Sequence, residues 1–534
     1  MKLPNAAEMH GLEQSAINDY HIPGIVLMEN AGLGTVRMIE EELGPPNGSF
    51  ALLFIGPGNN GGDGLVIGRH LHQRGCKPIF FFLVDPDKLS GDAAANMEIV
   101  RKLRLPFHII DSNARVQTIP VLYKQFINQG RPCYAIVDAI FGTGLARSVS
   151  DQFSETIKFI NDSDSVHGIP VIAVDIPSGM DSDNGKVLGT CIRADFTATY
   201  GCPKPGHVLH HGPEFSGKIK TIDIGIPPET LERARITTEL LDKKTAEELV
   251  SSLKRAANAH KGSHGHLAVL AGSVGKTGAA TLAVNGALRT GTGLISLFTP
   301  KDLNLIYETL LVEAMTISLP ASTSFVSVND LTFITQNIEG KNAVIIGPGI
   351  GTDPATTELV LRLYETIKLP MVLDADALNI LAENRDNLPS AAGPRIFSPH
   401  PGEMARLLGC TIDEIQDNRV KAAREACTIY SKARKDCIMI LKGAGTIVTT
   451  STGLTYINTS GNPGMATGGM GDVLTGIIGG LLCQNLDAEK AAAAGVFLHG
   501  MAGDILYEKN GFGYSASELA EQLPGCLTRL LKAS

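Results

Sequence analysis

The sequence predicts an α/β protein made of two units in series, each built on a largely parallel sheet with helices packed around it. Short apolar runs rich in β-branched residues alternate with longer helical patterns along the chain. This alternation is typical of βαβ units with buried strands. The chain has 534 residues, enough for two large domains, since a domain usually holds about 100–200 residues.

Apolar runs of strand length occur throughout both halves, and several end in Gly, Asp or Pro. In the first half the predicted strands are 51–55, 78–84, 134–138, 171–175, 197–200 and 218–224. In the second half they are 267–271, 294–299, 343–346, 371–374, 395–398 and 437–442. Open α/β sheets bind ligands in the loops at the carboxyl ends of their strands, so the residues that follow these runs are the functional candidates.

A proline pair separates the two halves. Pro227 and Pro228 stop the alternation, and a polar helical pattern follows over 237–254. We interpret this pattern as a linker helix and place the start of the second half near His260. The predicted domains are 1–230 and 236–534, and because the halves share no motif, the chain is interpreted as a fusion rather than a duplication.

Composition excludes several classes of function. With 46 Lys and Arg against 55 Asp and Glu, the net charge is −9, so there is no basic footprint for nucleic acid. The nine cysteines form no C-x-x-C pair, which favours a reducing compartment. The N-terminus lacks the apolar core of a signal peptide, and no uncharged apolar run reaches about 18 residues. We expect a cytoplasmic protein that binds neither nucleic acid nor membranes.

A glycine-rich segment, G-P-G-N-N-G-G-D-G at 56–64, follows the first predicted strand and precedes a helix. Gly56, Gly58 and Gly61 satisfy the dinucleotide fingerprint G-x-G-x-x-G. Asp85 follows the next strand, near the position of a ribose partner. By pattern alone, a Rossmann dehydrogenase is one interpretation.

The polar residues of this segment argue against a bound pyrophosphate. Asp63 would lie at the N-terminus of the following helix, where its charge would repel a phosphate group. Asn59 and Asn60 supply carbonyl oxygens, which suit hydroxyls and cations. We interpret the segment as a polar, partly cationic site; the alternative is a glycine-rich turn in which Asp63 caps the helix.

Two more predicted strand ends point to the same side of the sheet. In V-D-A-I-F-G-T-G-L-A-R, residues 137–147, the glycine loop offers backbone N–H groups and Arg147 can pair with an anion. The run V-D-I-P-S-G-M-D occupies 174–181. Asp138 and Asp175 each end an apolar strand; they could simply cap helices, but beside an asparagine loop they favour an active site.

The second half ends with a motif that suits phosphoryl transfer. The run N-P-G-M-A-T-G-G-M-G-D at 462–472 precedes a helix with an apolar face. Glycines at a helix N-terminus direct N–H groups at a phosphate, and Asp472 can accept a proton from an attacking hydroxyl. The alternative is a glycine-rich hinge in which Asp472 only caps the helix.

Other motifs in the second half are weaker. K-G-A-G-T at 442–446 ends a strand and suits nucleotide contacts, and His400 in S-P-H-P-G-E lies at another strand end, where substrate contact is favoured over a structural role. Lys276-Thr277 is not a P-loop, because the glycine required at position 270 is Leu270. Three nearby histidines, His260, His264 and His266, lack the carboxylate or thiolate that would complete a zinc site.

The first half resembles the NAD(P)H-hydrate epimerase family. The resemblance rests on G-N-N-G-G-D-G, V-D-A-I-F-G-T-G-L, D-I-P-S-G-M-D and C-P-K-P-G at 202–206, and it covers most of 1–230. It implies a Rossmann-like three-layer domain that interconverts the epimers of hydrated NADH and NADPH. The implied substrate-binding residues are Asn59, Asn60, Gly61, Gly62, Asp63, Gly142, Thr143, Gly144, Leu145, Ala146, Arg147, Ser148 and the catalytic Asp175. Asn60, Asp138 and Ser178 would hold a potassium ion, since oxygen ligands suit a hard cation.

The second half resembles the ribokinase-like NAD(P)H-hydrate dehydratase family over nearly all of 259–534. The matching runs are H-K-G-S-H-G-H at 260–266, G-A-A at 278–280, A-L-R-T-G-T-G at 287–293, G-P-G at 347–349, D-A-D-A-L at 374–378, S-P-H-P-G-E at 398–403 and G-M-G-D at 469–472. Gly291 departs mildly, since Ser or Ala is expected there. The implied hydrate-binding residues are Ala280, Gly349, His400 and the catalytic Asp472. The implied nucleotide-binding residues are Lys442, Gly443, Ala444, Gly445, Thr446 and Gly471, with ADP as co-substrate and magnesium.

Together the two resemblances imply a homo-oligomeric bifunctional repair enzyme. The first domain would interconvert the R and S hydrates, and the second would dehydrate the S hydrate while ADP becomes AMP and phosphate. The main alternative is a ribokinase-like kinase for a hydroxymethylpyrimidine or thiazole vitamin, fused to a dinucleotide-binding module.

Overall fold

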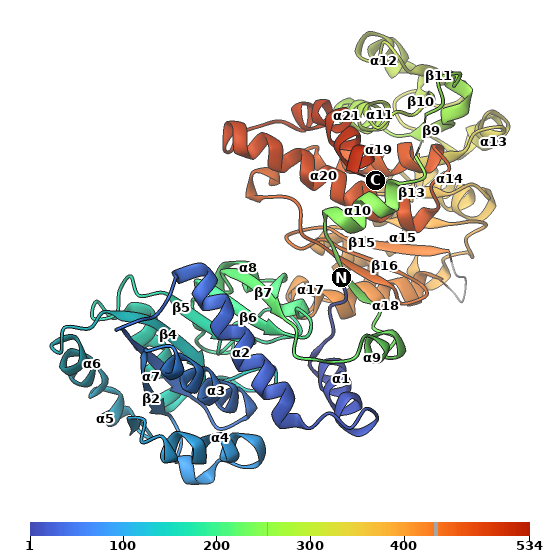
Figure 1. Cartoon of the computed structure of the whole chain (residues 1–534). Coiled ribbons are helices and arrows are strands. Elements are labelled where there is room, and N and C mark those ends of the chain that lie inside the picture. The colour runs from blue at the N-terminus through green and yellow to red at the C-terminus, as the bar shows by residue number, and fades with distance from the viewer. Residues whose placement is uncertain (254, 432–435, 534) are drawn as a thin grey trace. The chain divides into compact units, whose positions relative to one another are not determined.

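The computed structural model describes residues 1–253, 255–431 and 436–533. It divides the chain into two compact units, residues 2–236 and residues 237–534 together with Met1. Each unit is a central sheet with helices on its faces (Figure 1), so the predicted α/β fold class is confirmed. No helix among the described residues is both long and apolar enough to span a membrane.

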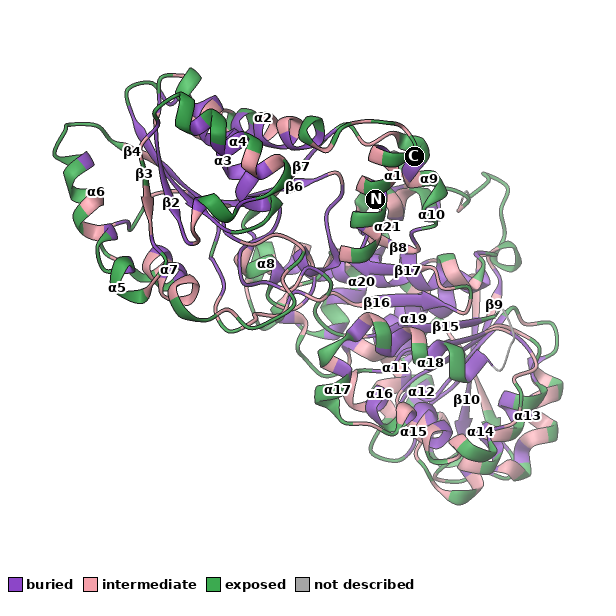
Figure 2. Cartoon of the chain, turned by 90° about the horizontal axis from the view of Figure 1, so that it is seen from below, coloured by how far each residue is buried: buried purple, intermediate pink, exposed green. Residues whose placement is uncertain are grey.

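The first unit contains a seven-stranded sheet in the order β3-β2-β1-β4-β5-β6-β7, and all neighbouring strands are parallel. The central strands are covered on both faces, so their side chains are mainly apolar; Figure 2 shows that β2 and β4 are largely buried. The strands are β1 Phe50–Ile55, β2 Lys77–Phe82, β3 Phe107–Ile109, β4 Cys133–Ala139, β5 Val171–Val174, β6 Phe196–Tyr200 and β7 Lys218–Ile222.

Alternate residues of β1 belong to two separate cores, which makes the unit a three-layer structure. Leu53 packs with helices α2, α3 and α4 on one face, and Leu52 packs with α6 and α7 on the other. The helices are α1 Ala6–Asn18, α2 Gly24–Leu43, α3 Asn59–Gln73, α4 Gly91–Lys102, α5 Asn113–Val116, α6 Ile119–Ile127, α7 Asp151–Asp162, α8 Gly212–Phe215 and α9 Pro228–Arg233.

The second unit contains a ten-stranded sheet in the order β11-β10-β9-β12-β13-β14-β15-β16-β17-β8. Strands β9 to β15 are parallel, whereas β15, β16 and β17 form an antiparallel meander. The strands are β8 Thr238–Leu241, β9 His266–Leu270, β10 Leu294–Pro300, β11 Met315–Leu319, β12 Ala343–Ile346, β13 Met371–Leu373, β14 Arg395–Phe397, β15 Cys437–Leu441, β16 Ile447–Thr450 and β17 Thr455–Asn458.

One helical layer of this unit consists of α10, α11, α19, α20 and α21, which share a core with β9 and β12. Helix α19 lies at its centre and is buried along most of its length. The helices of the unit are α10 Lys243–Val250, α11 Thr277–Arg289, α12 Asn304–Leu310, α13 Leu331–Ile338, α14 Pro354–Thr366, α15 Asp376–Glu383, α16 Pro401–Leu408, α17 Ile412–Asp417, α18 Arg419–Ser431, α19 Met470–Cys483, α20 Ala488–Asn510 and α21 Ala516–Ala533.

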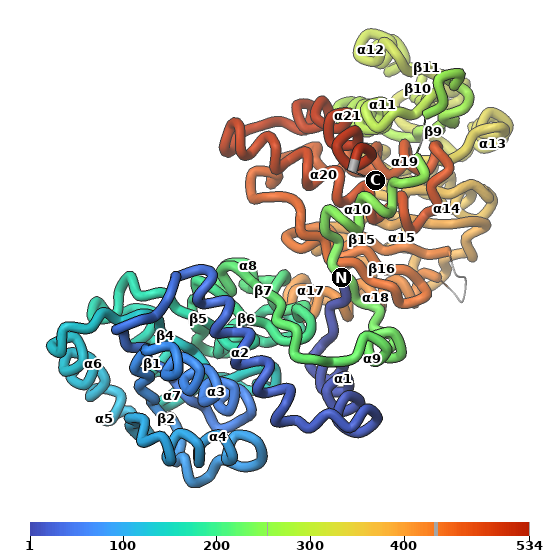
Figure 3. Tube along the Cα trace, in the orientation of Figure 1, coloured from blue at the N-terminus to red at the C-terminus, as the bar shows by residue number. Residues whose placement is uncertain are grey.

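The predicted linker helix over 237–254 is confirmed only for Lys243–Val250, which form α10; residue 254 lies outside the described residues. Residues Thr238–Leu241 form strand β8, which pairs with β17 at the sheet edge. Helix α10 follows and packs beside α20 (Figure 3). The segment therefore belongs to the second unit, which begins well before His260. Its strand partner lies far along the chain, so no local pattern could reveal the pairing.

More of the glycine-rich segment after β1 is helical than the sequence predicted. Helix α3 begins at Asn59, directly after Gly58, so Asp63 lies within the helix and not at its N-terminus. The helix glycines permit close packing on the sheet: a Cβ at Gly68 would lie 2.3 Å from Cζ of Phe80. The strands that sequence analysis did not predict are β3, β8, β11, β16 and β17.

Helices α11 and α19 approach each other through glycines. A Cβ at Gly476 would lie 2.0 Å from the carbonyl oxygen of Ala283, and one at Gly286 would lie 2.5 Å from that of Val473. Because both obstacles are backbone atoms, neither can rotate aside. The close contact between these helices thus depends on the absence of side chains.

We expect Gly476→Ala to lower the unfolding free energy of the second unit by about 1–3 kcal/mol or more, since an added methyl overpacks a rigid contact. Gly278→Ala is the matched control on α11, because no atom lies within 4 Å of its would-be Cβ; its stability should change by no more than about 1 kcal/mol. Urea unfolding followed by circular dichroism measures both. Equal midpoints for the two variants would contradict the packing argument.

Candidate active sites

The carboxyl ends of β1, β4 and β5 bring the predicted segments of the first unit together. A Cβ at Gly56 would lie 1.7 Å from the carbonyl oxygen of Ile140, so the chain leaving β1 touches the chain leaving β4. A Cβ at Gly142 would lie 3.2 Å from Oδ1 of Asn60. The asparagine turn and the glycine loop therefore face each other, as expected for parallel strands whose ends share one edge.

Asp138 and Ser178 join the ends of β4 and β5. The Ser178 hydroxyl donates to Oδ1 of Asp138 at 2.6 Å, and the Ser178 backbone N–H donates to Oδ2 at 2.8 Å. Burial raises the pKa of Asp138 to about 6, against the opposing effect of the Ser178 hydrogen bonds. The N–H of Phe141 donates in turn to the Ser178 hydroxyl at 2.8 Å. This network fixes the loop that carries Gly142.

Asp175 is held by a buried lysine. Lys204, which is fully buried, forms an ion pair with Oδ1 of Asp175 and donates to Thr199 Oγ1 at 3.0 Å. The backbone N–H of Tyr200 also donates to Oδ1, at 3.1 Å. Asp175 itself has φ 65°, a left-handed conformation that is uncommon outside glycine. Tertiary contacts thus fix both its backbone and one of its oxygens, while Oδ2 accepts no hydrogen bond from the described residues.

Two further carboxyl groups lie within electrostatic range of this ion pair. Burial raises the pKa of Asp63 well above its usual range, with added effects of Asp175 and Glu13 and an opposing effect of Lys204. Burial and then Asp175 raise the pKa of Glu13 to about 7, again opposed by Lys204. Sequence analysis missed Glu13, which lies on the polar helix α1 without any motif, and it gave Lys204 no role within C-P-K-P-G.

The remaining predicted residues of the first unit lie at the start of α3 and in the loop after β4. Asn60 is buried, and its Nδ2 has no hydrogen-bond partner among the described residues. Arg147 is exposed in the loop after β4, and it makes no hydrogen bond or ion pair within the described parts of the chain. Ser148 and the preceding loop residues are half-exposed or exposed.

In the second unit, Asp472 lies in the first turn of α19, beside a cluster of charged groups. Lys442, after β15, pairs with Oδ1 of Asp374 at 2.7 Å and lies 3.8 Å from Oε2 of Glu403. The Thr475 hydroxyl, one turn along α19, donates to Oδ2 of Asp374 at 2.8 Å. A Cβ at Gly471 would lie 3.3 Å from Nζ of Lys442, so the start of α19 rests on this lysine.

The groups around Asp472 raise the pKa of its carboxyl group towards neutral pH. Burial and then Asp374 raise its pKa, Lys442 lowers it, and Asp376 and Glu403 raise it further, to about 7. A carboxylate with such a pKa is suited to accept a proton at physiological pH. For Lys442, burial would lower the pKa, but Asp374 and Glu403 outweigh it and raise the pKa above its usual value.

His400 presents one defined hydrogen-bond donor. It caps α16, where its Nδ1 accepts from the backbone N–H of Gly402 at 3.0 Å and of Glu403 at 3.4 Å. Since Nδ1 is an acceptor, the proton of the neutral ring lies on Nε2. Burial lowers the pKa of His400, although Glu403 opposes the shift. The side chain is half-exposed, so its Nε2–H can reach a ligand.

Other predicted residues of the second unit have mainly structural contacts. Ala280 is fully buried on α11, so it shapes a wall and exposes no surface. Gly349 has φ 63°, and a Cβ there would lie 2.9 Å from Cβ of Lys276. The loop over 442–446 is closed by Thr446, whose hydroxyl donates to the carbonyl of Gly443 at 2.8 Å. The Lys442 ammonium contacts Asp374 instead of projecting from this loop.

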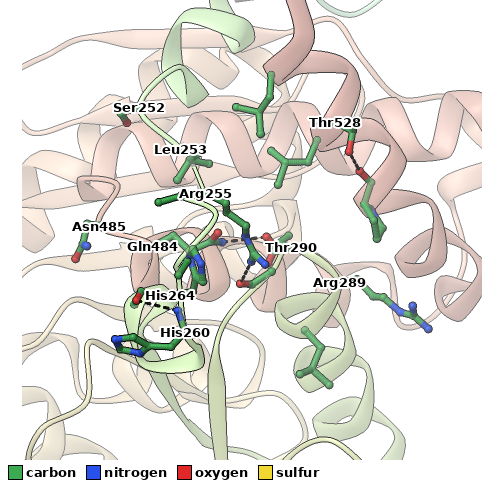
Figure 4. A pocket seen from close by; sticks show the side chains of 18 of the residues that line it. Ser252, Leu253, Arg255, His260, His264, Arg289, Thr290, Gln484, Asn485 and Thr528 are labelled. Carbon is green, nitrogen blue, oxygen red and sulfur yellow. Dashed lines mark hydrogen bonds between the residues drawn. The ribbon is translucent and has the colours of Figure 1, made fainter.

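A cavity of about 1010 Å³ lies away from Asp472, at the opposite ends of α11 and α19 (Figure 4). Thr290 and Gln484, which directly follow these helices, line it together with His260, His264 and Arg255. Helix α19 has 14 residues, so about 20 Å separates this cavity from the first turn of α19, which carries Asp472. Arg255 donates to the carbonyl oxygen of Gly291, and Figure 4 shows Arg289 directed away from the two histidines. The cavity contains none of the predicted site residues.

Each unit gathers charged side chains at the carboxyl ends of its parallel strands, an arrangement typical of two-domain α/β enzymes. Family models match residues 24–206, as "YjeF-related protein N-terminus", and residues 267–525, as "NAD(P)H-hydrate dehydratase". The bifunctional NAD(P)H-hydrate repair enzyme Nnr of Moorella thermoacetica is 40% identical, over 99% of this chain and 97% of that protein. The chain belongs to the family of bifunctional NAD(P)H-hydrate repair enzymes.

Further relatives cover both units. The Nnr enzyme of Escherichia coli K12 is 34% identical, over 90% of this chain and 85% of its own length. Among solved structures, the ADP/ATP-dependent NAD(P)H-hydrate dehydratase of Bacillus subtilis, co-crystallised with ATP and Mg²⁺, is 30% identical with a TM-score of 0.47. That match covers 55% of this chain and 98% of the Bacillus chain.

Removing the buried ammonium should destabilise the first unit. We expect Lys204→Met to cost about 3–5 kcal/mol, because it leaves the Asp175 carboxylate buried without its counter-ion. Lys218→Met is the matched control: Lys218 pairs with Glu42 at the surface, and such pairs contribute about 0–1 kcal/mol. Chemical denaturation of the full chain checks both variants; a Lys204→Met protein as stable as the control would refute the assigned pairing.

Proposed function

We propose that this enzyme repairs hydrated NADH and NADPH in two steps. The first unit interconverts the R and S hydrates, and the second unit returns the S hydrate to NAD(P)H while ADP is converted to AMP and phosphate. The full-length relatives with this printed name support the proposal. The observation that carries it is the position of Asp472 at the start of α19, beside Asp374 and Lys442 and with a pKa near neutrality.

In the second unit, Asp472 acts on the hydroxyl group of the S hydrate. Hydration places this hydroxyl on the ring carbon next to the ring nitrogen. Hydroxide is a poor leaving group and phosphate is a good one. Asp472 accepts the hydroxyl proton, and the oxygen attacks the terminal phosphoryl group of ADP. The N–H groups at the glycine-rich start of α19 stabilise the charge that develops. The electron pair of the ring nitrogen then expels phosphate, and loss of a proton from the adjacent ring carbon to water or phosphate restores the dihydropyridine.

The nearby side chains support this step. The Nε2–H of His400 offers a hydrogen bond to the ring's substituents. The carboxylates of Asp374 and Asp376 already pair with Lys442 and Lys276. We therefore infer that magnesium binds to the phosphates of the nucleotide and reaches the site together with it. When bound, it would neutralise charge on the transferred phosphoryl group.

In the first unit, Asp175 contacts the reacting ring, and oxygen atoms around the 140–142 turn suit a potassium ion. Asn60 contributes an amide oxygen, and Asp138 and Ser178 contribute their side-chain oxygens, a donor set that fits a hard cation. The unpartnered Nδ2 of Asn60 can donate to a ligand oxygen, and Arg147 can pair with an anionic group of the substrate. The potassium ion would supply a fixed positive charge that orients the substrate.

A vitamin kinase fused to a dinucleotide-binding module is not favoured. The bifunctional relatives match this chain across both units, whereas that alternative needs a non-catalytic first unit. The buried cluster of Asp63, Asp175 and Lys204 is poorly explained by simple ligand binding.

The direct test incubates the hydrates of NADH with ADP and magnesium and follows the return of absorbance in the reduced-nicotinamide band. We expect Asp472→Asn to lower kcat/KM for dehydration by about 10²–10⁴-fold, because the general base is lost. Epimerisation of the R hydrate, followed by chromatography, should be unchanged. Asp487→Asn, at the exposed start of α20, is the control. Loss of both activities in Asp472→Asn would contradict two separate sites.

The pH dependence of dehydration should report the ionisation of Asp472. The pKa is about 7 and the base must be ionised, so kcat/KM should rise with pH below 7, about tenfold per unit at the acidic end, and level off above it. Asp376→Asn removes a charge that raises this pKa, so the pH range over which kcat/KM rises should move to lower pH. Asp413→Asn, an exposed acid in the first turn of α17, serves as the control. A flat profile from pH 5.5 to 8 would exclude Asp472 as the base.

A further inference from the structure

Two carboxyl groups of the first unit, those of Asp63 and Glu13, lie within electrostatic range of the Asp175–Lys204 ion pair. Neither Asp63 nor Glu13 forms a side-chain hydrogen bond or ion pair with any described residue. Asp63 is only 8% exposed, and burying a carboxyl group without a partner is unfavourable. Buried carboxyl groups of this kind are typical of sites that bind a ligand or transfer a proton. Asp63 and Glu13 are therefore candidates for a function other than supporting the pair of Asp175 and Lys204.

Helix α1 brings Glu13 to this cluster. Asn5 and Glu8 form a capping box that fixes its start. Met9 and Leu12 pack on Cys202, and the Met9 methyl carbon lies 2.8 Å from the position that a Cβ of Gly201 would take. These residues directly follow Tyr200, whose N–H binds Asp175. Glu13 lies one turn after Met9 and so shares its face of the helix.

The electrostatic interactions agree with this placement. The charged groups that act on Glu13 are Asp175, which raises its pKa, and Lys204, which lowers it, after burial as the main cause; the result is a pKa of about 7. Glu13 in turn raises the pKa of Asp63. Near neutral pH, Glu13 is therefore present in both protonation states, and burial of Asp63 favours its protonated form. Glu13 is also partly exposed, so it can exchange its proton with water.

We propose that Glu13 is a catalytic acid–base residue of the first unit and works together with Asp175. The inference rests on the proposed epimerase activity. The two carboxyl groups belong to different elements, α1 and the turn after β5, and Lys204 lies within electrostatic range of both. A pair of this kind can take a proton at one atom of a substrate while giving one at another.

The chemistry of a ring carbon that carries both a hydroxyl and a nitrogen requires such a pair. One carboxylate removes the hydroxyl proton, the oxygen forms a carbonyl, and the carbon–nitrogen bond breaks while the other carboxyl group protonates the nitrogen. The carbonyl then turns its other face to the nitrogen. The ring recloses as the two protons return by the reverse transfers. No oxidant or reductant is consumed, and only the configuration of the carbon has changed.

Glu13→Gln in the full chain tests the proposal. We expect kcat/KM for epimerisation of the R hydrate to fall about 100-fold or more, with dehydration of the purified S hydrate unchanged. The wild-type pH profile should change slope near pH 7, and this feature should be absent from the residual activity of Glu13→Gln. Glu13→Asp should recover part of the rate. Asp19→Asn, an exposed acid at the end of the same helix, controls for the loss of one negative charge.

The outcomes separate the inference from the function on which it rests. A wild-type enzyme that fails to epimerise the R hydrate would overturn the proposed function. Wild-type epimerisation with a Glu13→Gln rate within twofold of it, at every pH, would overturn the role of Glu13 alone. A thermal melt of each variant shows whether α1 remains in place. If Glu13→Gln unfolds early and Glu13→Asp, though as stable as wild type, recovers no activity, the role of Glu13 is structural and the proposal fails.

Discussion

Each unit depends on a lysine, fully buried in the first unit and partly buried in the second, that pairs with an aspartate at the end of a parallel strand. Lys204 pairs with Asp175 after β5, and Lys442 pairs with Asp374 after β13. Parallel strands place their carboxyl ends at one edge, and polar groups gathered there lose hydration as helices cover the sheet. One ammonium group balances the charge of the aspartate with which it pairs. The neighbouring carboxyl groups are left without a full counter-charge. Those neighbours, Glu13 and Asp472, are the groups whose pKa values move to about 7.

Glycines make this arrangement possible by letting backbones meet. Gly56 brings the chain after β1 against the chain after β4, and Gly476 brings α19 against α11. In the second case the contact fixes the helix whose first turn carries Asp472. The high glycine content of the chain, 58 residues, therefore reflects close approach within the fold as well as flexible phosphate loops. Substitutions at these glycines would displace catalytic groups that they do not touch.

The strand pattern predicted much of the fold and the aspartates of the sites. The buried strands are recognisable because both their faces are apolar, and the acids at their carboxyl ends, Asp138 within β4 and Asp175 directly after β5, lie at the sheet edge where that rule places them. The pattern could not reveal β8, since its partner β17 lies far along the chain. It also placed Asp63 at a helix end, because glycines suggest a loop where α3 has already begun. Glu13 carries no local signal, since its position depends on how α1 packs on the turn after β6.

The left-handed backbone of Asp175 limits what evolution can place at this position. A side chain other than Gly, Asn or Asp strains the backbone there by about 1–2 kcal/mol, independently of any chemical role. The substitutions of Asp175 that avoid this strain are therefore those to Asn or Gly. A lineage that abandoned epimerisation would be expected to show Asn or Gly here before Ala or Val. The residue at this single position would then indicate whether a fused homologue still carries two activities.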